Sequence, residues 1–543
     1  MPRAARRPRR LSRSHSTVAG GNLVTRHRVV AVLTAVALLV GGCVTPSTRW
    51  VSATSGKVNQ PSEAPTAPMS LAQWRPCPEL AEELLQQAPA NYAFACATIR
   101  VPQDWTTAVN GQPADGKTFD LALVRVRSII QRASDRIGSV VVNPGGPGGS
   151  GVELAVYLSS ALPTALTSRF DIVGFDPRGV GRSTQISCFS SKDLDEYFGA
   201  DPDPTSQADF DAAVALQRRM AESCGTKYAE TLPLFSTEQT ANDMDAVRAA
   251  INDTQLTYLG YSYGTLLGAV YAQLYPQRVR AMVLDGAVDP TQTSTQDAEG
   301  QARGFERAFD NFAAWCRNTP SACPIGSDPR GVVTAAFDRA RTDPIVSGGG
   351  RTATAGWILT GIISSLYSQS GWRQLAGALN DLRKGNAGSI FALADQYAER
   401  DSAGDYSNLF DANAAVNCTD DDTTMTVEQL RQLQSQWRDK YPLFGAPLAL
   451  NLMCSQWPGK RDPYPTGAAT GAPPIVVVGT TGDPATPYEQ TATLARMLGV
   501  GVVLTWQGEG HTAYPQTRCI TDAVNTYLVD LSPPAAGTVC PPR

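Results

Sequence analysis

Histidine is scarce in this sequence, and this scarcity argues against a metal site that uses histidine ligands. Three histidines occur among 543 residues, and two of them, His15 and His27, precede residue 43. No two cysteines have the C-x-x-C spacing that is common in zinc sites. We therefore expect no metal site.

Acidic residues are absent from the first 42 residues, and the apolar run in that segment is short. Eight arginines precede or adjoin the run 29–40, whose twelve residues are fewer than the roughly 20 that a membrane-spanning helix needs. A basic start and a short apolar run are typical of an export signal. Because Val40-Gly41-Gly42-Cys43 resembles a lipobox, residues 1–42 are predicted to be a lipoprotein signal peptide and Cys43 the lipid-bearing residue. The alternative is an ordinary signal peptide cleaved near the same place.

Removal of residues 1–42 would leave a net charge of about −12, which argues against nucleic acid as a partner. Ten cysteines would remain besides Cys43, an even number that predicts five disulfides in an oxidising compartment. Their spacing favours local pairs, although other connectivities stay open: Cys77 with Cys96, Cys188 with Cys224, Cys316 with Cys323, Cys418 with Cys454, and Cys519 with Cys540. We expect a protein of the bacterial cell envelope, anchored by lipid to the outer face of the cell membrane, or secreted.

The pentapeptide Gly260-Tyr261-Ser262-Tyr263-Gly264 has the pattern G-x-S-x-G and lies between a strand-like run and a helix-like run. That is the setting of a nucleophile elbow, a strained turn that requires glycine on either side of the serine because a Cβ would clash. A glycine-rich turn with no catalytic role is the alternative. We expect Ser262 to be the nucleophile and the N–H of Tyr263 to donate to an oxyanion.

Three further segments favour the catalytic interpretation. The glycine-rich stretch 143–151 follows a buried-strand run and predicts the rest of the oxyanion hole, with the N–H of Gly146 as donor. Asp483 and His511 each follow a short apolar strand, and the order Ser262, Asp483, His511 is the one that α/β-hydrolases use. His511 is also the one histidine after residue 42, and it stands in a glycine-flanked loop, which favours a general base over a structural histidine.

Two assignments leave alternatives open. Asp285 and Asp289 follow the strand after the elbow helix, where some hydrolases place the triad acid; we favour Asp483 because its glycine-rich turn resembles a dedicated loop. The segment 176–183 could bind a substrate anion, but we favour a structural role in which Asp176 and Arg178 pair and brace loops beneath the catalytic turn.

The apolar pattern predicts an α/β fold with a mostly parallel sheet, helices on both faces and a large, mainly helical lid insertion. Short continuous apolar runs predict parallel strands covered on both faces, whereas 94–101 and 119–126 alternate and predict an antiparallel edge. Residues 236–251 open with a Ser-x-x-Gln capping box and predict the helix before the elbow strand. The expected domains are a signal peptide (1–42), a flexible linker (43–72), the first part of the hydrolase core (73–290), a helical lid (291–470) and the C-terminal part of the core (471–543).

From about Trp74 to Cys540, the chain resembles the secreted tripeptidyl aminopeptidase-like serine hydrolases of actinobacteria, which have the α/β-hydrolase fold. The resemblance rests on several motifs in order: Asn143 to Gly151, Phe170 to Ser183, the elbow continued by Thr265-Leu266-Leu267-Gly268, Val283 to Gly286 with Asp289-Pro290, Asp483, and Gly510-His511. It implies Ser262 as nucleophile, His511 as general base and acid, Asp483 as the residue that orients His511, and no cofactor. Such enzymes are described variously as aminopeptidases, proteases and carboxylesterases.

We therefore expect an exported serine exopeptidase that releases short peptides, tripeptides in particular, from free N-termini through an acyl-enzyme. The alternatives are a carboxylesterase or lipase acting on cell-envelope esters and, more distantly, a non-catalytic binding lipoprotein. A free N-terminus is an ammonium, which needs a carboxylate partner in a desolvated pocket. Asp420, in the acidic run 420–422 of the lid, is the candidate. The alternative is that this run precedes and caps a helix near Thr426, where Thr426 and Gln429 form a capping box.

Overall fold

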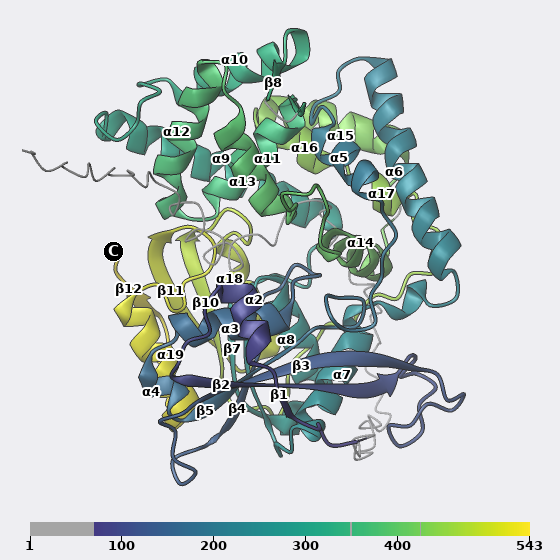
Figure 1. Ribbon diagram of the computed structural model, residues 1–543, viewed down its shortest axis with the longest axis vertical. Helices are drawn as coiled ribbons and strands as arrows, with labels where there is room; N and C mark the ends of the chain where they lie inside the picture. The colour runs from purple at the N-terminus through teal and green to yellow at the C-terminus, as the bar shows by residue number, and fades with distance from the viewer. Residues whose placement is uncertain (1–69, 348–349, 424) are drawn as a thin grey trace, which may run out of the picture.

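The computed structural model describes residues 70–347, 350–423 and 425–543, and Figure 1 shows a sheet-containing body with a layer of helices above it. The predicted signal peptide, Cys43 and all but the last residues of the predicted linker lie outside the described residues. Within the described ranges, no helix is long and apolar enough to cross a membrane.

Ten strands form one sheet in the order β1-β2-β3-β5-β4-β6-β7-β10-β11-β12. The strands are β1 (Arg75–Pro76), β2 (Tyr92–Pro102), β3 (Thr118–Ser128), β4 (Gly138–Asn143), β5 (Phe170–Phe175), β6 (Leu256–Tyr261), β7 (Val279–Asp285), β10 (Ile475–Gly482), β11 (Gly501–Glu509) and β12 (Thr538–Cys540). The pairs β1–β2, β2–β3 and β3–β5 are antiparallel, and every later pair is parallel. The predicted antiparallel edge and the predicted parallel centre are both confirmed.

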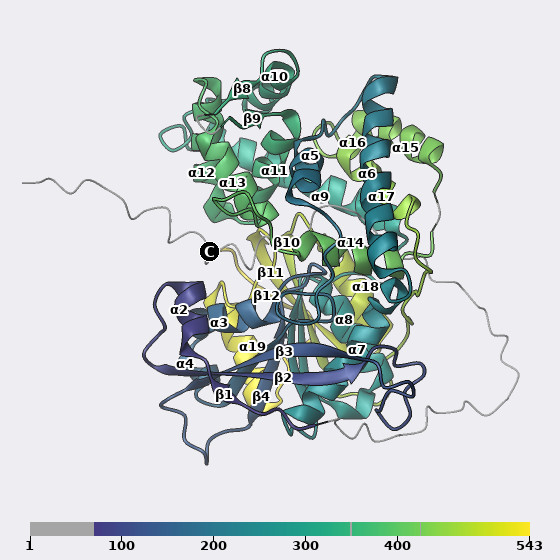
Figure 2. The same ribbon diagram turned by 45° about the vertical axis from the view of Figure 1, so that its right-hand side comes forward.

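Helices cover both faces of the sheet, as the continuous apolar runs predict. In β4, Val141 packs into one core cluster, whereas Val140 and Val142 pack into the other. The first cluster includes helices α7 (Thr237–Ala250), α8 (Tyr263–Leu274) and α18 (Glu489–Leu498), and the second includes α2 (Pro78–Leu85), α3 (Gly151–Ala161), α4 (Thr164–Thr167) and α19 (Arg518–Asp530) (Figure 2). Strands buried on both sides must be apolar at successive positions, which explains why their sequences do not alternate.

The chain between β7 and β10 forms the helical layer above the carboxyl edge of the sheet (Figure 1). Its helices are α9 (Ser294–Asn318), α10 (Pro329–Thr342), α11 (Ala355–Leu366), α12 (Trp372–Arg383), α13 (Gly388–Ala398), α14 (Leu409–Asp420), α15 (Val427–Lys440), α16 (Gly445–Ala449) and α17 (Leu452–Ser455), with a short hairpin of β8 (Ile345–Val346) and β9 (Thr352–Ala353). We call this layer the lid. Its position and helical content agree with the expected fold class.

Two further helices, α5 (Ser191–Gly199) and α6 (Gln207–Tyr228), belong to the segment that the sequence assigns to the core, yet they pack with the lid. Phe198 of α5 stacks on Trp357 of α11 with ring centroids 5.7 Å apart. Both figures show α5 and α6 beside the lid helices. The lid is therefore built from two insertions, one between β5 and α7 and the other between β7 and β10.

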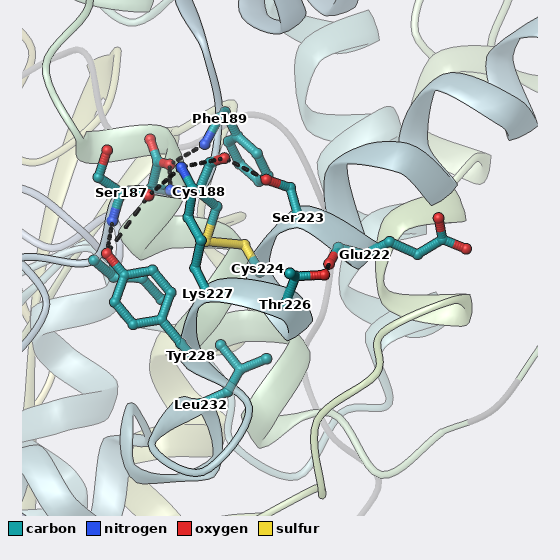
Figure 3. The surroundings of a disulfide bond; sticks show 12 residues. Ser187, Cys188, Phe189, Glu222, Ser223, Cys224, Thr226, Lys227, Tyr228 and Leu232 are labelled. Atoms are coloured by element: carbon teal, nitrogen blue, oxygen red, sulfur yellow. Dashed lines mark hydrogen bonds between the residues drawn. A yellow bond between two sulfur atoms is a disulfide. The ribbon is translucent and has the colours of Figure 1, made fainter.

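All five predicted disulfides are present: Cys77–Cys96, Cys188–Cys224, Cys316–Cys323, Cys418–Cys454 and Cys519–Cys540. Figure 3 shows the second of these, which ties the segment leaving the core to α6. Beside it, the Ser223 hydroxyl donates to the Cys188 carbonyl, and the Tyr228 hydroxyl accepts from the Ser187 N–H. The covalent link and these hydrogen bonds fix α6 relative to the core.

The predicted pairing of Asp176 with Arg178 is wrong. Arg178 is fully buried and makes two hydrogen bonds of 2.7 Å to Asp243 of α7, while its guanidinium lies 5.4 Å from the Phe119 ring centroid. Asp176 instead accepts bonds from the N–H groups of Val152 and Arg182 and from a serine hydroxyl. Both side chains make structural contacts, but their two charges contact different neighbours.

The capping box predicted at the start of α7 forms only in part. Ser236 caps the helix by accepting from the Gln239 N–H. The Gln239 side chain does not return to Ser236 but accepts from the N–H of Trp105. A tertiary contact has replaced the local one.

Candidate active site

The nucleophile elbow is present in the predicted form. Ser262, between β6 and α8, has φ 55° and ψ −127°, a strained conformation for a residue with a side chain. A Cβ on Gly260 would lie 2.4 Å from the Gly264 carbonyl oxygen, and one on Gly264 would lie 2.9 Å from the Asn143 carbonyl oxygen. The turn therefore requires both glycines, which is why the pentapeptide is readable from the sequence.

His511 is paired with Asp483 through its Nδ1 atom, which lies 2.9 Å from Oδ2 and 3.0 Å from Oδ1 of the carboxylate. The two loops meet because β10 and β11 are parallel neighbours that both end at this edge of the sheet. Asp483 also accepts from the N–H groups of Ala485 and Thr486, each at 2.9 Å, so its own orientation is fixed. With Nδ1 directed at a carboxylate, Nε2 is the nitrogen left to accept a proton. Nε2 is buried and has no hydrogen-bond partner.

The two competing acids have other partners. The Asp289 carboxylate accepts from the N–H and hydroxyl of Thr291. The Asp285 carboxylate accepts from the N–H groups of Ala513 and Tyr514. The structure thus pairs His511 with Asp483, the favoured candidate.

The glycine-rich loop after β4 lies directly against the elbow. A Cβ on Gly145 would lie 2.9 Å from the N atom of Tyr263 and 3.0 Å from the Cβ of Ser262. The N–H of Gly145 donates to the Asn143 side chain at 2.9 Å, which holds the start of the loop. Gly146, the predicted donor, is the next residue along this backbone. The loop therefore lies beside the elbow, and the role of the Gly146 and Tyr263 N–H groups as oxyanion donors stays a prediction.

The lid contacts both sides of this site. Asn413 of α14 donates from Nδ2 to the Pro147 carbonyl at 3.0 Å, which seats the helix on the glycine-rich loop. On the other side, the N–H of His511 donates to the Tyr367 carbonyl at 2.8 Å, and the two rings meet edge to face at 5.4 Å. Ser262 and His511 expose only 3% and 2% of their surface. The lid therefore covers both side chains.

Asp420 is the last residue of α14 and is buried near the elbow. Its carboxylate accepts from the N–H of Thr237 at 2.9 Å and from the Thr237 hydroxyl at 2.6 Å, and that hydroxyl lies 2.6 Å from the hydroxyl of Tyr263. Burial raises the pKa of Asp420 well above its usual value. The following helix, α15, is capped by Thr426 and Gln429 themselves, as predicted. Asp420 thus ends one helix and does not cap the next, and its role in binding an ammonium stays a prediction.

Several groups near the site are not predicted by the sequence. Tyr367 and Thr237 contact the catalytic loops from distant segments, and no local motif marks them. Burial and, as a smaller effect, the nearby Glu399 of the lid raise the pKa of Glu153, in the first turn of α3, to about 7. The two carboxylates are far apart in sequence, so only the fold brings them together. Within the described residues, no group of three or more His, Cys, Asp or Glu side chains is arranged to hold a metal ion.

Comparison with known proteins relates the whole chain to serine hydrolases. A family model described as "alpha/beta hydrolase fold" matches residues 138–499. Serine protease Hip1 of Mycobacterium tuberculosis is 36% identical over 534 residues, which cover 94% of this chain and 96% of the relative. Carboxylesterase B of the same species is 35% identical over 535 residues, with 95% and 99% covered. Tripeptidyl aminopeptidase of Streptomyces coelicolor is 33% identical over 460 residues, with 82% and 83% covered. The chain is thus similar to peptidases and to an esterase alike.

Proposed function

Since the chain belongs to the α/β-hydrolase family and is a serine hydrolase, we propose that it is an exopeptidase that releases short peptides, tripeptides in particular, from free N-termini. The observation that supports this proposal best is the buried His511–Asp483 pair, whose loop is linked through Asp285 to the elbow serine and is contacted by the lid. An enclosed site favours a chain end over the middle of a folded protein, because an internal peptide bond would have to pass beneath the lid from both directions.

In the proposed mechanism, Oγ of Ser262 attacks the scissile carbonyl carbon while Nε2 of His511 takes the hydroxyl proton. Asp483 holds the imidazole in orientation and stabilises its protonated form. The N–H groups of Gly146 and Tyr263 donate to the oxyanion of the tetrahedral intermediate. His511 then protonates the leaving amine, and the acyl-enzyme is hydrolysed by a water molecule that His511 deprotonates.

Recognition of the free N-terminus is the step that would distinguish an exopeptidase from an esterase. Asp420 is the proposed carboxylate partner of the ammonium. Its position next to Thr237, whose hydroxyl lies 2.6 Å from the Tyr263 hydroxyl, supports a place near the elbow. An ammonium bound against Asp420 would favour the ionised carboxylate, because an opposite charge lowers the pKa of a carboxyl group.

A direct comparison of substrates tests the proposed function. Tripeptidyl, monopeptidyl and acyl-ester chromogenic substrates should be hydrolysed in parallel, each with and without an N-terminal blocking group. We expect the unblocked tripeptidyl substrate to have the highest kcat/KM and the blocking group to abolish most of that advantage. Faster turnover of the ester than of any peptide would contradict the exopeptidase proposal.

A carboxylesterase is the second candidate, and one feature of the lid favours it. Between α5, α6, α11 and α16 lies a cavity of about 110 Å³, with Phe198, Leu359 and Phe444 among its lining residues. Such an apolar cavity could accept an acyl chain. Under this alternative, kcat/KM would rise with the acyl length of 4-nitrophenyl esters. The more distant possibility, a non-catalytic binding protein, predicts no labelling of Ser262 by a fluorophosphonate.

We also propose that the chain is exported to the cell envelope and held on the outer face of the membrane by lipid on Cys43. The five disulfides support an oxidising compartment, since such crosslinks are rare in the bacterial cytoplasm.

A further inference from the structure

Asp285 connects the two halves of the proposed catalytic machinery. It is the last residue of β7 and is fully buried. Its backbone carbonyl accepts from the N–H of Ser262 at 2.9 Å. Its carboxylate accepts from the N–H of Ala513 at 3.0 Å through each oxygen and from the N–H of Tyr514 at 2.7 Å. One residue therefore touches both the nucleophile and the loop that carries His511.

The surroundings of Asp285 make its ionised form unfavourable for the stability of the folded protein. Burial, aided by the charge of Asp483, raises its pKa to about 7 despite the lowering effect of the two backbone N–H donors and of His511. The other titratable group known to face it is Tyr261 of β6, whose own pKa is raised by burial and by the Asp285 charge. A neutral side chain that accepts the same hydrogen bonds would cost less to bury. When it is ionised, Asp285 therefore places a negative charge close to His511 at some cost to the stability of the fold.

We propose that Asp285 is a positioning residue for the general base: its carboxylate holds the His511 loop in register with Ser262, and its negative charge favours the protonated imidazole that forms during the reaction. The proposal rests on the proposed catalytic roles of Ser262, Asp483 and His511. Asp285 exchanges no proton with the substrate and forms no bond to it; it acts through the backbone of Ala513 and Tyr514 and through its charge.

Two replacements separate the two effects. In Asp285→Asn, one amide oxygen can still accept from Ala513 and Tyr514, so the change removes mainly the charge. Asp285→Ala removes the acceptor as well and frees the loop. We expect kcat to fall about tenfold in the amide variant and about a hundredfold in the alanine variant, with KM changed less than about twofold, because small misplacements of a catalytic group act on kcat.

The pH dependence provides a readout that a purely structural role would not change. The general base His511 must be unprotonated, and protonation of Asp285 should lower the rate about tenfold, as its amide does, so the acid limb of kcat/KM in the parent should be steeper than tenfold per pH unit around the pKa of Asp285, about 7. In Asp285→Asn only His511 remains, and the limb should follow a single protonation.

Stability should change in the opposite direction from activity. The folded-state pKa of Asp285 is about 7, and the unfolded value is about 3.9. Its contribution to stability is therefore present below pH 3.9 and is lost as the pH rises through 7. An amide has no such loss, so Asp285→Asn should melt at the same temperature as the parent or higher at pH 8.

Asp411→Asn is the matched control. Asp411 lies in α14, is buried, and its carboxylate also accepts from two backbone N–H groups, those of Cys188 and Phe189; burial raises its pKa to about 6. We expect this variant to keep the steep acid limb of the parent.

The experiment uses the full chain, 4-nitrophenyl acetate from pH 5 to 9, the inactivation rate with a fluorophosphonate, and thermal unfolding at pH 8. Parent-like turnover and a parent-like acid limb in Asp285→Asn, or the same loss of slope in Asp411→Asn, would overturn the proposal. Ser262→Ala is included throughout. Ester turnover in Ser262→Ala would refute the proposed triad itself, which is a different result from failure at Asp285.

Discussion

Two almost completely buried side chains, Ser262 and His511, carry the proposed chemistry at the scale of single residues. Ser262→Ala and His511→Ala should each lower kcat by about 10⁴-fold or more, because nucleophile and base act as one unit and only the oxyanion hole and substrate binding remain. The double variant should lose no more than the worse single variant. Steady-state kinetics on one substrate measures this, and circular dichroism checks the fold. Multiplied losses, or near-parent activity of His511→Ala, would show that the triad assignment is wrong.

A second prediction at the residue scale concerns the ammonium site. Asp420→Asn should raise KM for unblocked peptides about tenfold or more and barely affect a small neutral ester, because only the peptide offers a charge to pair. Both substrates must be measured on the same preparation.

Thr237→Val is the control for Asp420. It removes the hydroxyl between Asp420 and Tyr263 but leaves the carboxylate in place. Equal losses on both substrates in both variants would indicate a structural defect at this contact. No loss for Asp420→Asn would shift attention to another lid acid, and Glu399→Gln is the variant to measure next because Glu399 faces Glu153.

At the scale of elements, the buried ion pair between Arg178 and Asp243 fastens α7 to the loop after β5. Asp243→Asn should lower the free energy of unfolding by about 3–5 kcal/mol, because it leaves the guanidinium buried without its counter-charge. Glu196→Gln is the matched control: its partner Arg219 is 54% exposed, so the loss should stay below about 1 kcal/mol. Urea unfolding of both variants makes the comparison, and similar losses would contradict the importance of burial.

Features that depend on residues of a single turn can be predicted from the sequence. Features that depend on contacts between distant segments cannot. The capping box of Thr426 and Gln429 forms as predicted, since it involves only residues of one turn. The same pattern at Ser236 forms only in part, because Trp105 takes the Gln239 side chain. Helices α5 and α6 have ordinary helical sequences, and nothing local indicates that they pack with the lid.

At the scale of the whole molecule, the proposed lipid anchor decides where the enzyme acts. Cys43→Ala should move the protein from the membrane fraction to the soluble fraction or block its processing, because each buried methylene of an acyl chain contributes about 0.8 kcal/mol. Fractionation followed by mass spectrometry of the N-terminal peptide measures both effects. Unchanged membrane retention with normal cleavage and no attached lipid would contradict the anchor.

The amino-acid sequence by itself determined the features that depend on local geometry and on chain order. The elbow around Ser262 is readable because its backbone admits only glycine at positions 260 and 264. The parallel strands are readable because burial on both faces demands continuous apolar runs. Asp483 and His511 are recognisable as candidates because each follows such a strand, and the local disulfide pairing is favoured because all five pairs close short loops.

Only the tertiary structure decided which of several candidate side chains meet. The sequence leaves Asp285 and Asp483 as alternative partners of His511. Because β10 and β11 are paired in parallel, the loops at their ends bring Asp483 to His511. Asp285, at the end of β7, instead accepts a hydrogen bond from the loop that follows His511. The tertiary structure likewise pairs Arg178 with Asp243 and not with Asp176. The physical reason is the same in each case. A charged side chain in a loop is long enough to reach several possible partners. The packing of elements that are distant in sequence decides which of these partners lies within hydrogen-bond distance once the side chain is buried.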